Sequence, residues 1–76
     1  MNNDRRKTLA KLSAQVEELK DQIDSILDEE RNYYDSMPES LQSSDRGQAS
    51  EQAVSALETA VSSLDDAKNS LDEASQ

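Results

Sequence analysis

The sequence predicts an all-α fold: an antiparallel helical hairpin, coiled-coil-like, that pairs with a second copy into a four-helix bundle. Apolar residues recur at spacings of three and four along two long stretches, which is the pattern of a heptad repeat. A short connection containing the only proline separates the two stretches. The 76 residues therefore form one domain, residues 1–76.

Composition and charge restrict the classes of function. The chain has no Cys, so disulfide and thiolate chemistry are excluded, and we expect a cytoplasmic location. No run of 18 apolar residues is present, so we expect no membrane partner. The net charge is −9, with +3 on residues 1–12 and −12 on the rest. Such a surface repels nucleic acid, so we expect no direct nucleic-acid binding, and it favours a basic protein partner.

The first predicted helix covers about residues 4–36, with Asp4 as its N-cap. Its predicted core seam has two columns, interrupted only by Glu30: Leu9, Val16 and Ile23 in one, and Leu12, Leu19, Ile26 and Tyr33 in the other. Leu27 and Tyr34 lie just beyond this seam and indicate a second neighbour.

The connection covers about residues 37–44. Pro38 disfavours helical geometry at Met37 and ends the first helix. One helical turn is expected over residues 38–42, and either Ser43 or Ser44 is expected to cap the next helix.

The second predicted helix covers about residues 45–74. Its seam consists of Val54, Leu57, Val61, Leu64, Lys68 and Leu71. Two flanking columns also repeat every seven residues. One is small, Ala53, Ala60, Ala67 and Ala74, and is interpreted as a contact surface. The other is acidic, Glu51, Glu58, Asp65 and Asp72, and is interpreted as solvated, with mimicry of nucleic-acid charge as a less favoured alternative.

A short connection makes the two helices antiparallel neighbours. Facing residue numbers should then sum to about 80. This rule pairs Ile23 with Leu57, Leu19 with Val61, Ile26 with Val54, Leu12 with Lys68, Glu30 with Ser50 and Tyr33 with Gly47. It also places the basic run Arg5, Arg6 and Lys7 beside Asp72 and Glu73 at the open end, although contact of this run with an anionic partner is the alternative.

One hairpin buries only part of each seam, so we expect a homodimer, most simply with an antiparallel two-fold arrangement. The residues expected to make dimer or hairpin contacts are Leu19, Ile23, Ile26, Leu27, Ala53, Leu57, Ala60, Val61, Leu64 and Ala67.

The residue types do not favour catalysis. His and Cys are absent, and the neighbouring carboxylates lie on different helix faces, so we expect no enzyme. We expect no cofactor and no metal site, because the spacings of di-iron bundles, EF-hands and phosphate loops are missing.

The turn end is the one place where aromatic rings, cations and non-helical backbone coincide. Its candidate partner contacts are Arg31, Tyr33, Tyr34 and Arg46. Simple packing at the end of the bundle is the alternative interpretation of the same residues.

The turn sequence ERNYYDSMPESLQSSDRG, within residues 29–47, resembles the turn of small acidic helical-hairpin proteins encoded by bacteria and phages. In that family the turn precedes an acidic, Ala-rich helix, which AVSALETAVSSLDDAKNSLDEA resembles here. The resemblance implies a bacterial or phage accessory protein. It implies no activity, because none is known for the family.

Three functions therefore remain open. The first is a non-enzymatic module, a dimeric hairpin that binds another protein. The second is an acidic inhibitor that covers a basic surface of a defence or nucleic-acid-binding protein. The third is an oligomer that sequesters a small ligand, with the pocket between turn tips.

Overall fold

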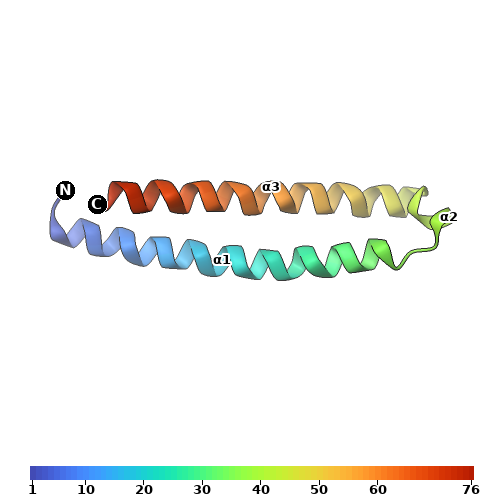
Figure 1. Cartoon of the computed structure of the whole chain (residues 1–76), viewed down its shortest axis with the longest axis horizontal. Helices are drawn as coiled ribbons and strands as arrows, with labels where there is room; N and C mark the ends of the chain where they lie inside the picture. Colours follow the sequence, from blue (N-terminus) through green and yellow to red (C-terminus); the bar gives the residue numbers. More distant parts are fainter.

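The computed structural model describes residues 1–76 and contains three helices and no strand: α1, Asn3–Asp35; α2, Glu39–Gln42; and α3, Asp45–Ala74. Helices α1 and α3 lie side by side and antiparallel, α2 forms the turn, and both termini lie at the opposite, open end (Figure 1). The hairpin is a rod with extents of 58 × 14 × 12 Å. None of its helices combines the length and apolarity that crossing a membrane requires.

The N-terminus of α1 is capped two residues earlier than the sequence suggested. The side chain of Asn2 accepts a hydrogen bond from the backbone N–H of Arg5 at 2.8 Å, so Asn2 and not Asp4 is the N-cap. Asn is as good a cap as Asp because its side-chain oxygen reaches the same N–H group. Asp4 lies in the first turn, where its negative charge complements the helix dipole.

The turn is tight because α2 folds back against the start of α3. Pro38 has an extended backbone and precedes the single turn of α2. Ser44 caps α3 by accepting from the backbone N–H of Gly47 at 3.4 Å. A Cβ at Gly47 would overlap the carbonyl oxygens of Leu41 and Gln42, so glycine is required by this close approach. The groups closest to Gly47 are thus backbone atoms of Leu41 and Gln42, and Tyr33, its predicted neighbour, remains 48% exposed.

Helix α3 presents the predicted stripe to α1. Its seam residues Val54, Leu57, Val61, Leu64, Lys68 and Leu71 are all half-buried. At the turn end the buried Ser50 donates a hydrogen bond to the Glu30 carboxylate at 2.7 Å, which confirms the predicted pairing of these two residues. This polar layer fixes the register of the helices where the seam lacks apolar side chains.

Helix α1 turns a different stripe toward α3 from the one predicted. The column Leu9, Val16 and Ile23 is half-buried, as expected. The second column is Ser13, Lys20, Leu27 and Tyr34, in which Ser13 and Leu27 are only 4% exposed. The predicted column faces solvent, with exposed fractions of 42% for Leu12, 51% for Leu19, 53% for Ile26 and 48% for Tyr33.

The predicted pairings of Leu12 with Lys68, Leu19 with Val61 and Ile26 with Val54 are therefore wrong. In this rotation of α1, Leu27 is buried, and Ser13, Lys20 and Tyr34 each meet a hydrogen-bond acceptor on α3. Hydrophobic periodicity does not predict polar contacts of this kind.

The resulting core is thin. Leu27, 4% exposed, is the only buried residue with a large apolar side chain, and no large side chain is completely enclosed. The chain exposes 5458 Å², whereas a compact monomer of its mass would expose about 4600 Å². Most apolar side chains of this hairpin are thus only partly buried: one side contacts the neighbouring helix and the other faces solvent.

Candidate interaction surfaces

One long edge of the rod is polar and joins the two helices. We call it the charged edge, and its acidic members are the α3 column Glu51, Glu58, Asp65 and Asp72. Each of these carboxylates contacts a side chain of α1. Near the turn, Tyr34 donates a hydrogen bond to Glu51 at 3.3 Å, and the Arg31 guanidinium lies 3.6 Å from the Glu58 carboxylate. Toward the open end, Lys20 donates to Asp65 at 3.1 Å and Ser13 donates to Asp72 at 2.6 Å. The interpretation of this column as solvated agrees with the exposure of Glu51, Glu58 and Asp65, but the column also contacts α1, which the sequence did not indicate.

These contacts change the ionisation of four groups. The pKa of Asp72 is lowered, because its carboxylate accepts hydrogen bonds from Ser13 and from Lys68. The same contact with Asp72 raises the pKa of Lys68, and Asp65 raises the pKa of Lys20. The pKa of Tyr34 is raised first by partial removal of its phenol from water and then by the negative charge of Glu51. The shifts of Lys20, Tyr34 and Asp72 favour the ionisation states of their cross-helix contacts at neutral pH, and the shift of Lys68 favours its contact with Asp72 within α3.

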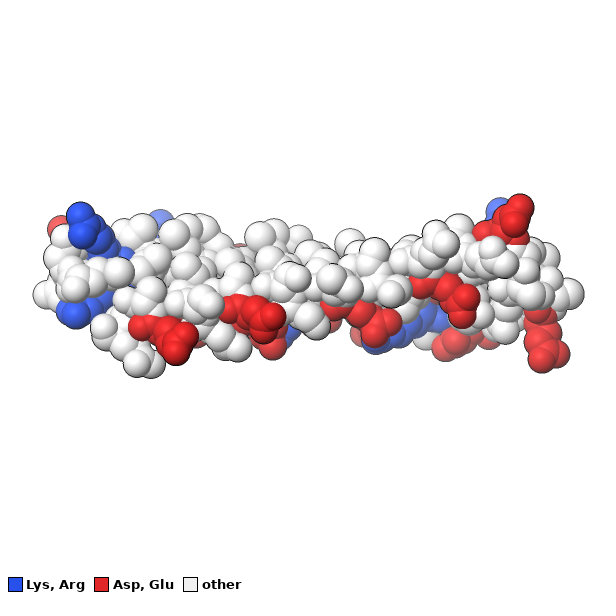
Figure 2. All heavy atoms as spheres, turned by 90° about the horizontal axis from the view of Figure 1, so that it is seen from above, with Lys and Arg blue, Asp and Glu red and all other residues white.

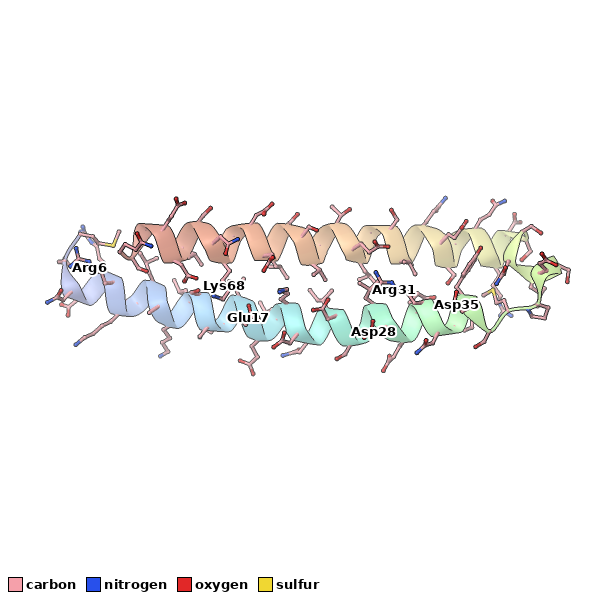
Figure 3. All side chains as sticks on the ribbon, viewed as in Figure 1. Arg6, Glu17, Asp28, Arg31, Asp35 and Lys68 are labelled. Carbon is pink, nitrogen blue, oxygen red and sulfur yellow. The ribbon has the colours of Figure 1, made fainter.

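The basic side chains of this edge reach between the helices. Figure 3 shows Arg31 and Lys68 extending from their own helix into the interval between α1 and α3. Lys68 donates to Asp72 on its own helix at 2.9 Å, and Arg31 also lies 3.6 Å from Asp28. Lys68 is half-buried, so its methylenes cover the seam while its ammonium group reaches the edge.

The acidic side chains remain partly available to a partner. Their side chains are 53% exposed at Glu58, 53% at Asp65 and 47% at Asp72. Seen from above, acidic groups gather along one long edge of the rod, while the opposite edge is uncharged except near its ends (Figure 2).

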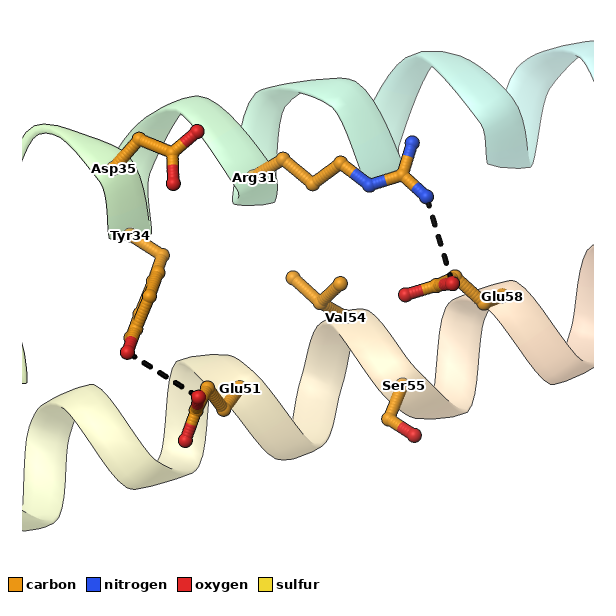
Figure 4. A pocket seen from close by; sticks show the side chains of 7 residues that line it. All are labelled: Arg31, Tyr34, Asp35, Glu51, Val54, Ser55 and Glu58. Atoms are coloured by element: carbon orange, nitrogen blue, oxygen red, sulfur yellow. Dashed lines mark hydrogen bonds and ion pairs between the residues drawn. The ribbon is translucent and has the colours of Figure 1, made fainter.

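An open groove of about 570 Å³ lies on the charged edge near the turn. Its lining residues are Arg31, Tyr34, Asp35, Glu51, Val54, Ser55 and Glu58. Figure 4 shows the Tyr34 hydroxyl directed at Glu51 and the Arg31 guanidinium directed at Glu58. The polar groups at its centre are thus paired with one another across the two helices.

The four candidate partner contacts at the turn end do not form one cluster. Arg31 and Tyr34 line the groove together. Tyr33 lies on another face of α1 and is exposed, and Arg46 is exposed in the first turn of α3 and does not line the groove. Adjacent tyrosines in the sequence thus lie on different surfaces, because successive helical residues are about 100° apart.

The opposite edge of the rod is apolar. The column Ser13, Lys20, Leu27 and Tyr34 contacts the acidic column, so the column one residue earlier points toward the other edge. We call this surface the apolar edge, and it consists of Leu12, Leu19, Ile26 and Tyr33 on α1 with Ala53, Ala60 and Ala67 on α3. The Ala column belongs to it because it flanks the α3 seam on the side away from the acidic column. Ala53 and Ala60 are half-buried, and Ala67 is exposed.

The expected dimer or hairpin contacts divide between two places. Ile23, Leu57, Val61 and Leu64 are half-buried and Leu27 is buried, all on the stripes that pack α1 against α3. Leu19, Ile26, Ala53, Ala60 and Ala67 belong to the apolar edge.

Sequence reasoning missed Ser13, Lys20 and Asp65 as contact residues. The signal that could have found them is the matched period of seven in the column Ser13, Lys20, Leu27, Tyr34 and in the acidic column of α3.

The expected ion pairs between the two termini are absent. Arg6 forms a hydrogen bond with Asn3 in its own helix, at 3.4 Å, and makes no ion pair with Asp72 or Glu73. Asp72 is instead occupied by Ser13 and Lys68. The basic run is therefore left exposed or half-buried at the open end.

Comparison of this chain with known proteins identifies no relative. No family model, no curated protein and no solved structure matches the chain. A functional assignment therefore depends on the two edges of the hairpin and on the residues that form them.

Proposed function

We propose that this chain is a non-enzymatic protein-interaction module that works as a homodimer of helical hairpins. The observation that carries the proposal is the apolar edge, where Leu12, Leu19, Ile26 and Tyr33 stay 42–53% exposed along one face. An exposed apolar surface of this length marks a protein-binding site in soluble helical proteins. Dimerisation covers it and leaves the charged edge free for another protein.

The energetics of the hairpin support pairing. Helices gain most of their stability from packing an apolar face, and α1 has only one helical neighbour for two apolar columns. Burying a Leu or Ile side chain completely contributes about 1.5–3 kcal/mol. A second hairpin on the apolar edge therefore adds a core that a single hairpin lacks.

Two lysine substitutions at neighbouring positions test this proposal. Ile26→Lys places a charge on the apolar edge, whereas Ser25→Lys makes the same addition at an exposed position facing away from α3. We expect light scattering on a sizing column to report a dimer for the unmodified chain and for Ser25→Lys, and a monomer for Ile26→Lys. Equal masses for both variants would contradict the proposal, because a monomer exposes both positions.

A second candidate function is favoured by the one-sided distribution of charge. We propose as the alternative that the charged edge covers a basic surface of another protein, as an acidic inhibitor would. The supporting observation is the line of half-exposed carboxylates at Glu58, Asp65 and Asp72. Attraction of this kind weakens as salt screens it.

Matched charge removals test the alternative with a lysine-rich peptide as the probe. Glu58→Gln with Asp65→Asn removes two charges from the charged edge, and Glu18→Gln with Asp21→Asn removes two from the exposed side of α1. The alternative predicts a larger loss of affinity for the first pair, and a loss for the unmodified chain at high salt. Equal effects of the two pairs would contradict it.

A further inference from the structure

The apolar edge and the distribution of charge along the rod together define how two copies meet. We infer that a second copy of this chain docks on the apolar edge in the antiparallel sense, so that the turn of each copy lies over the open end of the other. This inference rests on the proposed dimer and adds its interface and orientation.

The first step is the choice of surface. Each copy carries a net charge of −9, so two copies repel wherever their acidic surfaces meet. The apolar edge contains no Asp, Glu, Lys or Arg; its residues are Leu12, Leu19, Ile26, Tyr33, Ala53, Ala60 and Ala67. Figure 2 shows the corresponding long edge free of charged groups except near its ends. Two copies therefore meet with least repulsion along the apolar edge.

The second step is the size of the surface. The chain exposes 5458 Å², about 850 Å² more than a compact monomer of its mass, because a rod of 58 × 14 × 12 Å has a large surface for its volume. A stable dimer buries about 800 Å² on each partner. From Leu12 to Tyr33 the column is about 32 Å long at 1.5 Å per residue. A second copy offers a column of the same length, so the two surfaces cover each other completely.

The third step is orientation. Residues 28–51, at the turn end, contain seven Asp or Glu and two Lys or Arg, a net charge of −5. Residues 1–12 and 65–76, at the open end, contain five of each, a net charge of zero. With both turns at one end, two −5 regions would adjoin. The antiparallel arrangement separates them by nearly the 58 Å length of the rod.

The antiparallel arrangement also gives consistent packing. A two-fold axis across the middle of the rod places α1 on α1 of the partner subunit and α3 on α3 of the partner subunit. Leu19 then packs near Ile26 of the partner subunit. The Ala columns face each other, and small residues allow the two copies of α3 to approach closely.

Spin labels at the turn tip test the orientation. The chain has no Cys, so Ser40→Cys creates a single labelling site at an exposed position of α2. Double electron–electron resonance on this variant should give a distance close to the 58 Å length of the hairpin. A parallel dimer would bring the two labels to about 20 Å, roughly twice the separation of packed helices.

The outcomes separate the inference from the proposed function. The short distance would overturn the antiparallel orientation and leave the dimer intact. No dipolar signal would overturn the dimer and the orientation together. A mixture of chains labelled at Ser40→Cys and at Gln76→Cys provides a second measurement, and only the antiparallel arrangement predicts a new distance of about 20 Å in it.

Discussion

At the scale of single residues, the hydrogen bond between Ser13 and Asp72 joins the two helices near the open end. Its length is 2.6 Å, and Asp72 also accepts from Lys68 at 2.9 Å. Ser13 is 4% exposed, so its hydroxyl would lack a partner if the Asp72 carboxylate were replaced by a group that cannot accept.

We predict that the stability contributed by Asp72 depends on pH. Its folded-state pKa lies below the ordinary value of 3.8, so the ionised carboxylate stabilises the folded chain above about pH 4. This contribution is lost as the pH falls through the lowered pKa, where the carboxylate becomes neutral. Asp72→Asn should therefore lower the thermal unfolding midpoint at pH 7. This difference between the variant and the unmodified chain should become smaller as the pH falls below about 4.

Glu73→Gln is the control for that measurement, since Glu73 is exposed one residue further on and its side chain makes no cross-helix contact. Midpoints should be measured by circular dichroism at one protein concentration. An Asp72→Asn effect that stays constant down to pH 2, or that Glu73→Gln reproduces at pH 7, would contradict the role of this hydrogen bond.

At the scale of the helices, α1 and α3 differ in how far their packing could be predicted. Helix α3 has one apolar stripe with an acidic column on one flank and alanines on the other, so its seam was predicted correctly from Val54 to Leu71. Both long helices also begin and end within one residue of the predicted limits. Pro38 and the serines before α3 are strong local signals for these limits.

Helix α1 has two candidate columns beside Leu9, Val16 and Ile23. Leu12, Leu19, Ile26 and Tyr33 form the more hydrophobic one, and Ser13, Lys20, Leu27 and Tyr34 form the other. Hydrophobic periodicity favours the first, although it does not distinguish a neighbour in the same chain from one in a second chain. The second column packs against α3, where Leu27 is buried and Ser13, Lys20 and Tyr34 meet acceptors of the acidic column, a match that depends on both helices at once.

Leu27 reports which column of α1 packs against α3. It is 4% exposed, whereas the neighbouring Ile26 is 53% exposed. Truncation of a buried Leu to Ala costs about 2–5 kcal/mol, and a volume-conserving change to Met costs less than about 1.5 kcal/mol. We predict a large fall in the midpoint of thermal unfolding for Leu27→Ala and a small one for Leu27→Met. Indistinguishable midpoints for the two variants would show that Leu27 is not packed as described.

At the scale of the whole molecule, the hairpin is a rod with two unlike edges. The seam packs α1 against α3, and the charged edge adds hydrogen bonds and an ion pair from α1 side chains to its carboxylates. The apolar edge contributes little to the hairpin itself, since its α1 side chains remain about half exposed. The two copies that we propose would bury this edge and keep both charged edges outside.

The sequence showed the excess of apolar surface without showing where it lies. From the sequence, Leu27 and Tyr34 indicate a second neighbour beyond the hairpin, whereas the structure places them against α3. The exposed surface consists instead of Leu12, Leu19, Ile26 and Tyr33, which were assigned to the seam of the hairpin. The two columns of α1 exchange places relative to the prediction, because a small rotation of a helix about its axis changes the direction of every side chain on it.

Sedimentation equilibrium of the unmodified chain at micromolar concentration tests most directly the central claim that the chain forms a homodimer through its apolar edge. The method measures the mass in solution without labels or substitutions. We predict a mass of twice 8.4 kDa that falls only on strong dilution. A mass of 8.4 kDa throughout the micromolar range would show that the apolar edge stays uncovered and would contradict the account.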